Sequence, residues 1–147
     1  MSMIDLGHWH SKLPHFDPKD WCGFVYLITN GKTNKKYYGK KFFTSVSHKK
    51  VKNRTNRKKI IKESNWRTYT GSSKLLNEDI ELLGKENFQF EILSLHECRS
   101  SLAYAELKRI VMSDALVFKN DFYNGLIPSI KYHPTMESDR EKQFKII

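Results

Sequence analysis

Residues 21–62 contain half of the basic residues of this chain and no acidic residue, which restricts where the segment can lie in a folded protein. The segment holds 13 of the 26 Lys and Arg residues and none of the 16 Asp and Glu residues. The formal net charge of the rest of the chain is therefore 13 − 16 = −3. We expect a surface that binds a polyanion, and the alternative is a lysine-rich loop that only keeps the protein soluble.

Size and composition are those of one folded domain. The chain has 147 residues, of which 39% are hydrophobic and 13% aromatic. No apolar run approaches the roughly 20 residues that span a bilayer, so we expect no membrane partner. The first 16 residues contain no apolar stretch of signal-peptide length, and Cys22 and Cys98 form no disulfide framework. These features predict a cytoplasmic protein with free thiols.

A β-hairpin is predicted inside the basic segment. Residues 24–29 are mostly β-branched or aromatic, Asn30-Gly31 suits a tight turn, and residues 35–39 form the return strand. The hairpin would bring Tyr26 and Tyr37 together on neighbouring strands. After it, residues 46–62 are too rich in Lys and Asn for a core, which predicts a mobile loop or a helix ordered by its partner.

Two helices and one further strand follow the basic segment. Residues 74–83 have a helical apolar pattern, and Ser72 or Ser73 can cap the helix. Residues 88–92 alternate apolar and polar side chains as a half-buried strand does. Residues 101–117 are predicted to form the second helix.

These elements predict an α/β (α+β) fold, with a small three-stranded, mainly antiparallel sheet flanked by helices. The expected organisation is an irregular N-terminal arm at residues 1–20, a folded domain at 21–127 that carries a basic insertion at about 44–62, and a C-terminal tail at 128–147.

Glu106 is the acidic residue that stands out. It lies near the edge of the apolar stripe of the second predicted helix, where a carboxylate needs a hydrogen bond, a basic partner or a bound cation. A boundary residue that bends out to solvent is the alternative. Because Mg²⁺ keeps most of its waters and needs few protein ligands, one inward carboxylate can serve as its site.

Several short motifs, in order, resemble those of the GIY-YIG nuclease family. They are Gly23-Phe24-Val25-Tyr26, Lys36-Tyr37-Tyr38-Gly39-Lys40, Gly71-Ser72-Ser73, Glu106 and Tyr123-Asn124. The sequences Tyr-Gly-Lys-Lys-Phe-Phe and Trp-Arg-x-Tyr-x-Gly-Ser-Ser are similar to those of phage-encoded, Seg-like homing endonucleases. The resemblance covers roughly residues 22–125.

The resemblance implies a role for each residue that matches a motif. Tyr26 and Tyr37 would lie in the active site, Glu106 would bind Mg²⁺ or Mn²⁺, and Asn124 would contact the phosphate near the scissile bond. Arg67 is our choice for the arginine of the family, and Lys40 and Lys62 are the other candidates. Water activation would fall to Tyr26, which needs a pKa lowered by nearby cations or a proton relay through water.

The sequence therefore predicts a divalent-metal-dependent endonuclease that hydrolyses phosphodiester bonds in double-stranded DNA, in the host cytoplasm if a phage encodes it. A separate specificity partner or a homodimer could supply sequence selection. The basic residues expected to bind nucleic acid are Lys40, Lys41, Lys49, Lys50, Lys52, Arg54, Arg57, Lys58, Lys59 and Lys62.

Two other functions fit the same basic segment. One is a catalytically silent nucleic-acid-binding module that uses the same basic face. The other is a small RNA-binding protein, for which Phe42-Phe43 and Trp66 would be stacking platforms.

Overall fold

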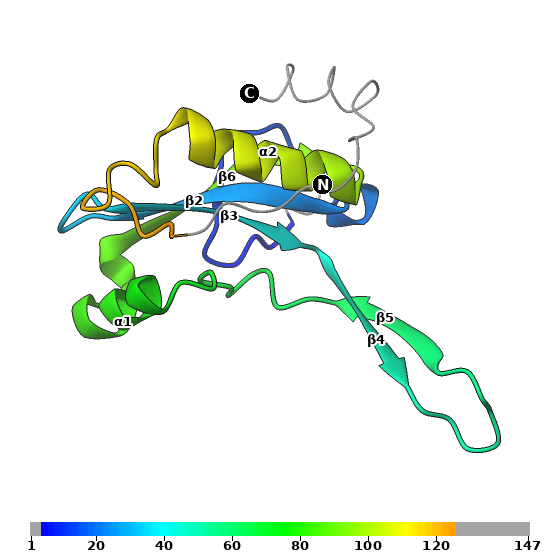
Figure 1. Cartoon of the computed structure of the whole chain (residues 1–147). Coiled ribbons are helices and arrows are strands. Elements are labelled where there is room, and N and C mark those ends of the chain that lie inside the picture. The colour runs from blue at the N-terminus through cyan, green and yellow to red at the C-terminus, as the bar shows by residue number, and fades with distance from the viewer. Residues whose placement is uncertain (1–3, 126–147) are drawn as a thin grey trace.

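The computed structural model describes residues 4–125, so the predicted tail at 128–147 lies outside the described residues. Figure 1 shows a sheet between two helices, with a two-stranded ribbon that extends away from it. The elements in chain order are β1 (His10–Ser11), the 3₁₀ helix η1 (Pro18–Asp20), β2 (Gly23–Asn30), β3 (Lys36–Phe42), β4 (Thr44–Lys49), β5 (Lys58–Glu63), α1 (Lys74–Leu83), the 3₁₀ helix η2 (Lys85–Asn87), β6 (Phe88–His96) and α2 (Arg99–Met112).

The main sheet confirms the predicted α+β class but has four strands, in the order β1-β6-β2-β3. The central strand β2 is antiparallel to both β3 and β6. The additional strand is β1, which comes from the N-terminal arm and pairs in parallel with Glu91 and Ile92 of β6. The prediction of three strands missed it because two residues are too few to show a strand period.

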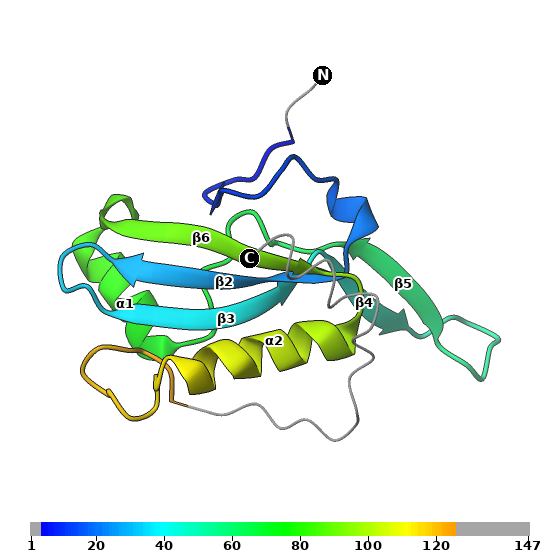
Figure 2. The same ribbon diagram turned by 90° about the horizontal axis from the view of Figure 1, so that it is seen from above.

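Two apolar layers cover the two faces of the sheet. On one face α2 packs against β2, β3 and β6, and Val25, Leu102 and Ala105 are buried there (Figure 2). The other face carries the larger core, to which the N-terminal arm contributes Trp9 and α1 contributes Leu76. Because Trp9 is only 3% exposed, the arm is part of the packed structure.

The first helix agrees with its prediction and the second ends earlier. The α1 helix spans Lys74–Leu83, and the Ser73 hydroxyl accepts the Leu76 N–H at 3.3 Å as an N-cap. The α2 helix ends at Met112, and Asp114 follows with a left-handed φ of 54°. That turn ends the helix although apolar residues continue beyond it. None of the helices within residues 4–125 is both long and apolar enough to span a membrane.

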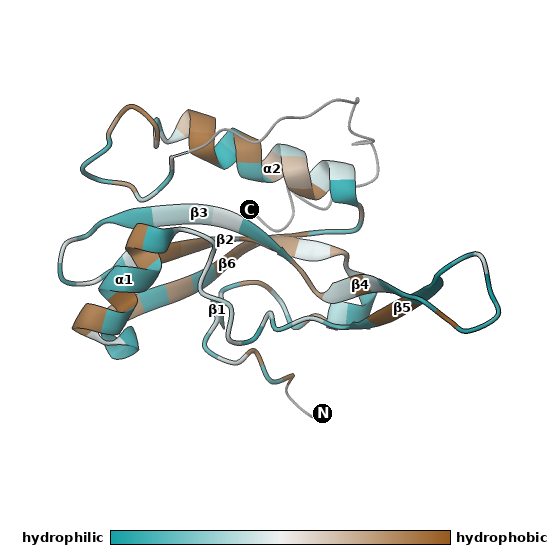
Figure 3. Cartoon of the chain, turned by 60° about the horizontal axis from the view of Figure 1, so that its bottom comes forward, coloured by the Kyte–Doolittle hydropathy of each residue, from teal (hydrophilic) through white to brown (hydrophobic). Residues whose placement is uncertain are grey.

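The basic insertion is a β-ribbon, so the prediction of a mobile loop or a helix was wrong. Strands β4 and β5 pair antiparallel with each other and form a separate two-stranded sheet. Figure 3 shows an apolar section on β5 and a hydrophilic tip beyond it. Val46, Ile60 and Ile61 favour extended backbone, which accounts for the strands. The abundance of lysine masked this signal.

Candidate active site

Three tyrosines gather on the face of the sheet that is opposite α2. The ring of Tyr26 on β2 lies 6.2 Å, between centroids, from Tyr37 on β3 and from Tyr69 on the loop that follows β5. The hydroxyl groups of Tyr26 and Tyr37 share a hydrogen bond, and the Tyr37 hydroxyl lies 3.2 Å from Ser72 Oγ. The hairpin thus brings Tyr26 and Tyr37 together as the sequence predicted, and the cluster also contains Tyr69 and Ser72.

Gly39 makes room for this cluster. It lies inside β3, directly opposite Tyr26 in the strand register. A Cβ atom at residue 39 would overlap the hydroxyl oxygen and the adjoining ring carbon of Tyr26, so that ring can lie across β3 only because residue 39 has no side chain.

Residues 121–124 run along the outer edge of β3, which has no neighbouring strand of the sheet. The Lys36 N–H donates to the Asp121 carbonyl oxygen at 2.9 Å, and the Tyr123 N–H donates to the Lys36 carbonyl oxygen at 2.7 Å. Two residues along the strand, the Asn124 amide takes the place of a backbone partner. It accepts the Tyr38 N–H at 3.0 Å and donates to the Tyr38 carbonyl oxygen at 2.8 Å.

Glu106 of α2 occupies the next position on the same edge. Its carboxylate accepts the backbone N–H of Lys40, and Lys40 Nζ lies 3.9 Å from Glu106 Oε1. The side chain of Glu106 is 12% exposed, so it points inward as its place on the helix predicted. Asn124 and Glu106 therefore follow one another along the β3 edge, beside Tyr37.

The ionisable groups of the site are perturbed mainly by burial. Burial raises the pKa of Tyr26 well above its ordinary value, and the neighbouring Tyr37, Tyr69 and Glu106 raise it further. Burial also raises the pKa of Glu106, against the opposing effect of Lys40. The basic segment therefore does not ionise Tyr26 in this structure, and its hydroxyl is neutral at physiological pH.

Cations also lie close to the tyrosines. The Nζ atom of Lys41 is 4.0 Å from the centroid of the Tyr69 ring, a cation–π distance. Partial burial lowers the pKa of Lys41. Lys40 and Lys41 are neighbours on β3 and point to opposite faces of the sheet, so each face carries one of these cations near the β3 edge.

A hollow of about 550 Å³ opens beside this edge. Its lining includes Tyr37, Ser72, Ser73, Glu106, Tyr123 and Asn124. The sheet face supplies the tyrosine and α2 supplies the carboxylate, and both groups line this hollow at the β3 edge. The hollow can admit a phosphodiester to both groups.

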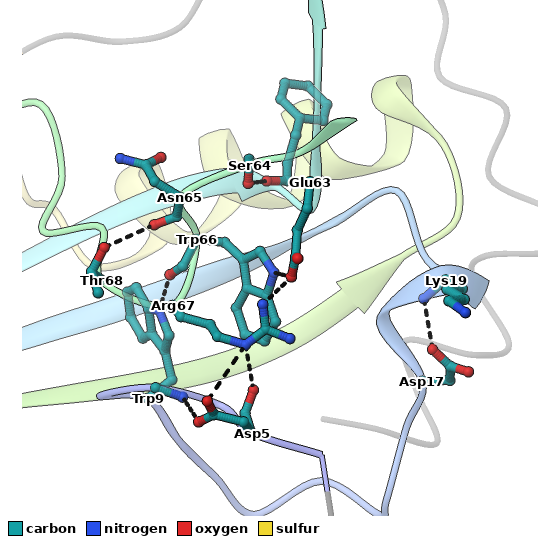
Figure 4. Close-up of polar contacts among 12 residues, drawn as sticks. Asp5, Trp9, Asp17, Lys19, Glu63, Ser64, Asn65, Trp66, Arg67 and Thr68 are labelled. Atoms are coloured by element: carbon teal, nitrogen blue, oxygen red, sulfur yellow. Dashed lines mark hydrogen bonds and ion pairs between the residues drawn. The ribbon is translucent and has the colours of Figure 1, made fainter. Parts of the chain in front are cut away.

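Arg67 has its partners elsewhere, between the N-terminal arm and the base of the ribbon (Figure 4). Its Nε donates to the Asp5 carbonyl oxygen at 2.8 Å, its guanidinium pairs with Glu63, and it lies 4.4 Å over the ring of Trp66. Within residues 4–125 these contacts connect Arg67 to the arm and the ribbon, and none of them includes Tyr26, Tyr37 or Glu106.

The residues expected to bind nucleic acid fall into two groups. Lys41 lies at the tyrosine cluster and Lys40 beside Glu106. The other eight lie on the ribbon and its tip, all exposed: Lys49, Lys50, Lys52, Arg54, Arg57, Lys58, Lys59 and Lys62. Phe43 and Trp66 are 2% and 0% exposed. Neither can be a stacking platform for RNA bases, so that part of the RNA-binding alternative was wrong.

A magnesium or manganese ion fits the site through one carboxylate. Within residues 4–125 no three His, Cys, Asp or Glu side chains gather as a metal cage. Glu106 lines the open hollow, and its carboxylate has more acceptor positions than Lys40 uses. This arrangement suits an ion that keeps most of its waters.

A comparison with protein families agrees with this geometry. A family model described as "Putative endonuclease segE, GIY-YIG domain" matches residues 9–127. No match was found among curated proteins or among solved structures. The matched range includes the arm residue Trp9, all four strands of the main sheet, the ribbon and both helices.

Proposed function

The chain belongs to the Seg-like GIY-YIG nuclease family, and from this premise we propose that it is a divalent-metal-dependent endonuclease that cuts duplex DNA at the β3 edge. The observation that supports the proposal most is the meeting of Tyr37 and Glu106 at one open hollow. A nuclease needs a polarised phosphoryl group, an activated water and a stabilised leaving oxygen close together. A surface that only binds nucleic acid does not need an inward carboxylate.

Glu106 would hold the metal ion. A bound Mg²⁺ or Mn²⁺ supplies charge that stabilises the phosphoryl and leaving oxygens. Lys40, which pairs with Glu106 in this structure, is then available to the phosphate backbone. Lys41, beside Tyr69, contributes a second positive charge on the other side of the strand.

The tyrosine hydroxyl groups would hold the attacking water and carry its proton away. Because the Tyr26 hydroxyl is neutral, we propose that the proton moves through a relay of neutral hydroxyl groups and that no ionised tyrosine acts as the base. The hydrogen-bonded series Tyr26, Tyr37 and Ser72 leads from the buried ring to the open hollow. The Tyr37 hydroxyl lines the hollow and would accept the proton of the attacking water while it passes its own proton to Ser72 Oγ. The Ser72 hydroxyl proton would then leave to solvent, and the buried Tyr26 hydroxyl would hold Tyr37 in place.

Asn124 would position the edge on which the site is built. Its amide holds the backbone of Tyr38 through two hydrogen bonds. A carboxamide nitrogen carries two N–H groups, and the second is our candidate for the phosphate contact. Arg67 would act on the arm and ribbon instead, since its partners are there.

The wider setting is proposed by analogy with the family. We propose a homing-type enzyme encoded by a phage that acts in the host cytoplasm on double-stranded DNA, with a homodimer or a separate partner for specificity. The nuclease domain predicted at residues 21–127 would fold together with the arm predicted at residues 1–20, because the arm strand β1 belongs to the main sheet.

The function is tested with supercoiled plasmid, Mg²⁺ or Mn²⁺, and the variant Glu106→Gln. Glutamine keeps an oxygen that can accept the Lys40 N–H but loses the charge that holds a cation. We expect wild type to nick or linearise the plasmid only with metal, and Glu106→Gln to be slower by more than about 100-fold. Gel analysis of the nicked and linear forms measures this.

A matched variant separates the site from general charge effects. Glu81→Gln removes an exposed carboxylate from α1 and should cut as wild type does. Both variants should bind DNA in EDTA as wild type does, because neither alters the basic surface. Full cleavage by Glu106→Gln would refute the assigned site. Wild-type binding without cleavage in either metal would identify a catalytically silent nucleic-acid-binding module.

A further inference from the structure

Most residues of the β4–β5 ribbon are exposed, and the ribbon places like charges opposite each other. Each strand has six residues and neither contains a buried one. Lys49 lies directly opposite Lys58 in the register. Like charges at such positions destabilise a strand pair. The arrangement is therefore favourable mainly when an anion is bound between or beside the lysines.

The cations of the ribbon lie on both of its faces. Directly paired residues share a face, and the faces alternate along each strand. His48 and its partner Lys59 lie on one face, while Lys49 and its partner Lys58 lie on the other. A ribbon lying flat on a row of phosphates would need cations on one face only. Because a lysine side chain is long and flexible, lysines of either face can bend past a strand edge, so this ribbon is suited to a site with anions beyond both edges.

An apolar pair is exposed between these cations. Val46 and its partner Ile61 share the face of His48 and Lys59, and they are 45% and 60% exposed. Phosphates make no apolar contact with such a pair. The base edges in the DNA major groove can make one, because thymine presents a methyl group there.

We propose that the β4–β5 ribbon enters the major groove of the DNA that the active site cuts, with the face of Val46 and Ile61 toward the base edges. The long lysine side chains of both faces would bend past the two strand edges to the phosphates of the groove walls. This inference rests on the proposed function, because it takes duplex DNA as the substrate. The major groove is wide enough for a two-stranded ribbon, and its two backbones supply anions on both sides.

The ribbon also sets where these contacts fall relative to the cut. Strand β4 begins two residues after β3 ends, and the ribbon extends away from the sheet (Figure 1). Six extended residues span about 20 Å, which equals about six base pairs along a duplex. The protein should therefore contact DNA asymmetrically, with the ribbon on one side of the scissile phosphate.

The test measures binding in EDTA, where catalysis plays no part, to three forms of one duplex. One form is unmodified, one carries bulky groups at C5 of its pyrimidines in the major groove, and one has its minor groove occupied by netropsin. We expect the C5 groups to weaken wild-type binding by about tenfold or more. Netropsin should change the Kd by less than about twofold, since it does not obstruct the major groove.

Two variants tie that result to the ribbon. Lys49, Lys58, Lys59 and Lys62 changed together to Gln should flatten the dependence of log K on log salt by about two to four units and remove the sensitivity to C5 groups. Control changes of the exposed Lys12, Lys19, Lys108 and Lys119 to Gln should leave that sensitivity intact. Val46→Ala with Ile61→Ala should weaken binding without changing the salt slope.

Each other outcome overturns the proposal. Sensitivity to netropsin instead of C5 groups would place the ribbon in the minor groove. Insensitivity to both, with a flattened slope in the lysine variant, would show a ribbon lying on phosphates alone. Either result leaves metal-dependent cleavage intact and so leaves the proposed function standing. Failure of wild type to bind any duplex would overturn both.

Discussion

At the scale of single residues, Gly39 shows how a missing side chain can build a site. Glycine inside a strand usually weakens it, because it adds chain entropy and buries no apolar surface. Here the empty position opposite Tyr26 lets the tyrosine ring lie over the strand. Gly39 thus weakens the strand, but it allows the Tyr26 hydroxyl to lie next to Tyr37.

We predict that Gly39→Ala destabilises the protein and displaces Tyr26. The new methyl group overlaps buried ring atoms, and such overpacking costs about 1–3 kcal/mol. Urea unfolding should show the loss, and plasmid cleavage should fall even where the variant is fully folded. Gly125→Ala is the control for the stability measurement, because a Cβ there would meet nothing within 4 Å. Equal stability and activity of both variants would show that the position of Tyr26 is not critical.

At the scale of elements, the ribbon and the main sheet are separate structures joined at a narrow base. Phe43 N–H donates to the Cys22 carbonyl oxygen and Ser64 N–H donates to the Phe43 carbonyl oxygen, while the Ser64 hydroxyl donates to the Phe42 carbonyl oxygen at 2.6 Å. These bonds close the base independently of the strands beyond it. The core therefore does not depend on the ribbon.

We predict that the ribbon can be removed without unfolding the protein. Thr44 and Glu63 are directly paired, so an Asn-Gly turn can join them in place of residues 45–62. The Tm should change by less than about 5 °C, since no buried residue is lost. Cleavage at saturating DNA should persist while the affinity falls. Loss of the cooperative transition in a thermal melt would show that the ribbon belongs to the core.

At the scale of the whole molecule, the N-terminal arm is attached through a histidine that must stay neutral. His8 Nε2 donates to the Tyr69 carbonyl oxygen at 2.9 Å, and the ring stacks 4.0 Å from Phe90. Burial and the charge of Lys85 lower the pKa of His8 from 6.5 to about 4. Within residues 4–125 its Nδ1 is buried with no hydrogen-bond partner, so nothing there stabilises a second proton.

This pKa predicts a loss of stability in mild acid. The unfolded chain binds a proton at His8 near pH 6.5 and the folded chain only near pH 4, so stability is full above pH 6.5 and falls as the pH decreases between these values. Urea midpoints at pH 7.5 and 5.5 measure the effect.

His8→Gln is the informative variant, because glutamine can donate to Tyr69 but does not titrate. We expect it to reduce the difference between the two midpoints. The control His15→Gln changes an exposed histidine and should keep the wild-type difference. An unchanged difference in His8→Gln would assign the acid sensitivity to other groups.

The sequence predicted the parts of this protein that depend on neighbouring residues. The Asn30-Gly31 hairpin, the α1 helix with its Ser73 cap and the α+β class follow from turn chemistry and short periods, which act over a few residues. The hairpin places Tyr26 and Tyr37 on neighbouring strands, and Gly39 lets their side chains meet. The inward direction of Glu106 follows from its place on a helix.

Tertiary structure decided which distant segments meet. The pairing of β1 with β6, the burial of Trp9 and the place of Asn124 on the β3 edge each join residues far apart in the chain. Arg67, chosen from its motif, found its partners in Asp5 and Glu63 instead. Such contacts depend on the free energy of the whole packed arrangement, which no local window of sequence contains. The candidate residues of the site could therefore be named from the sequence, whereas their meeting at one sheet edge was decided by the fold.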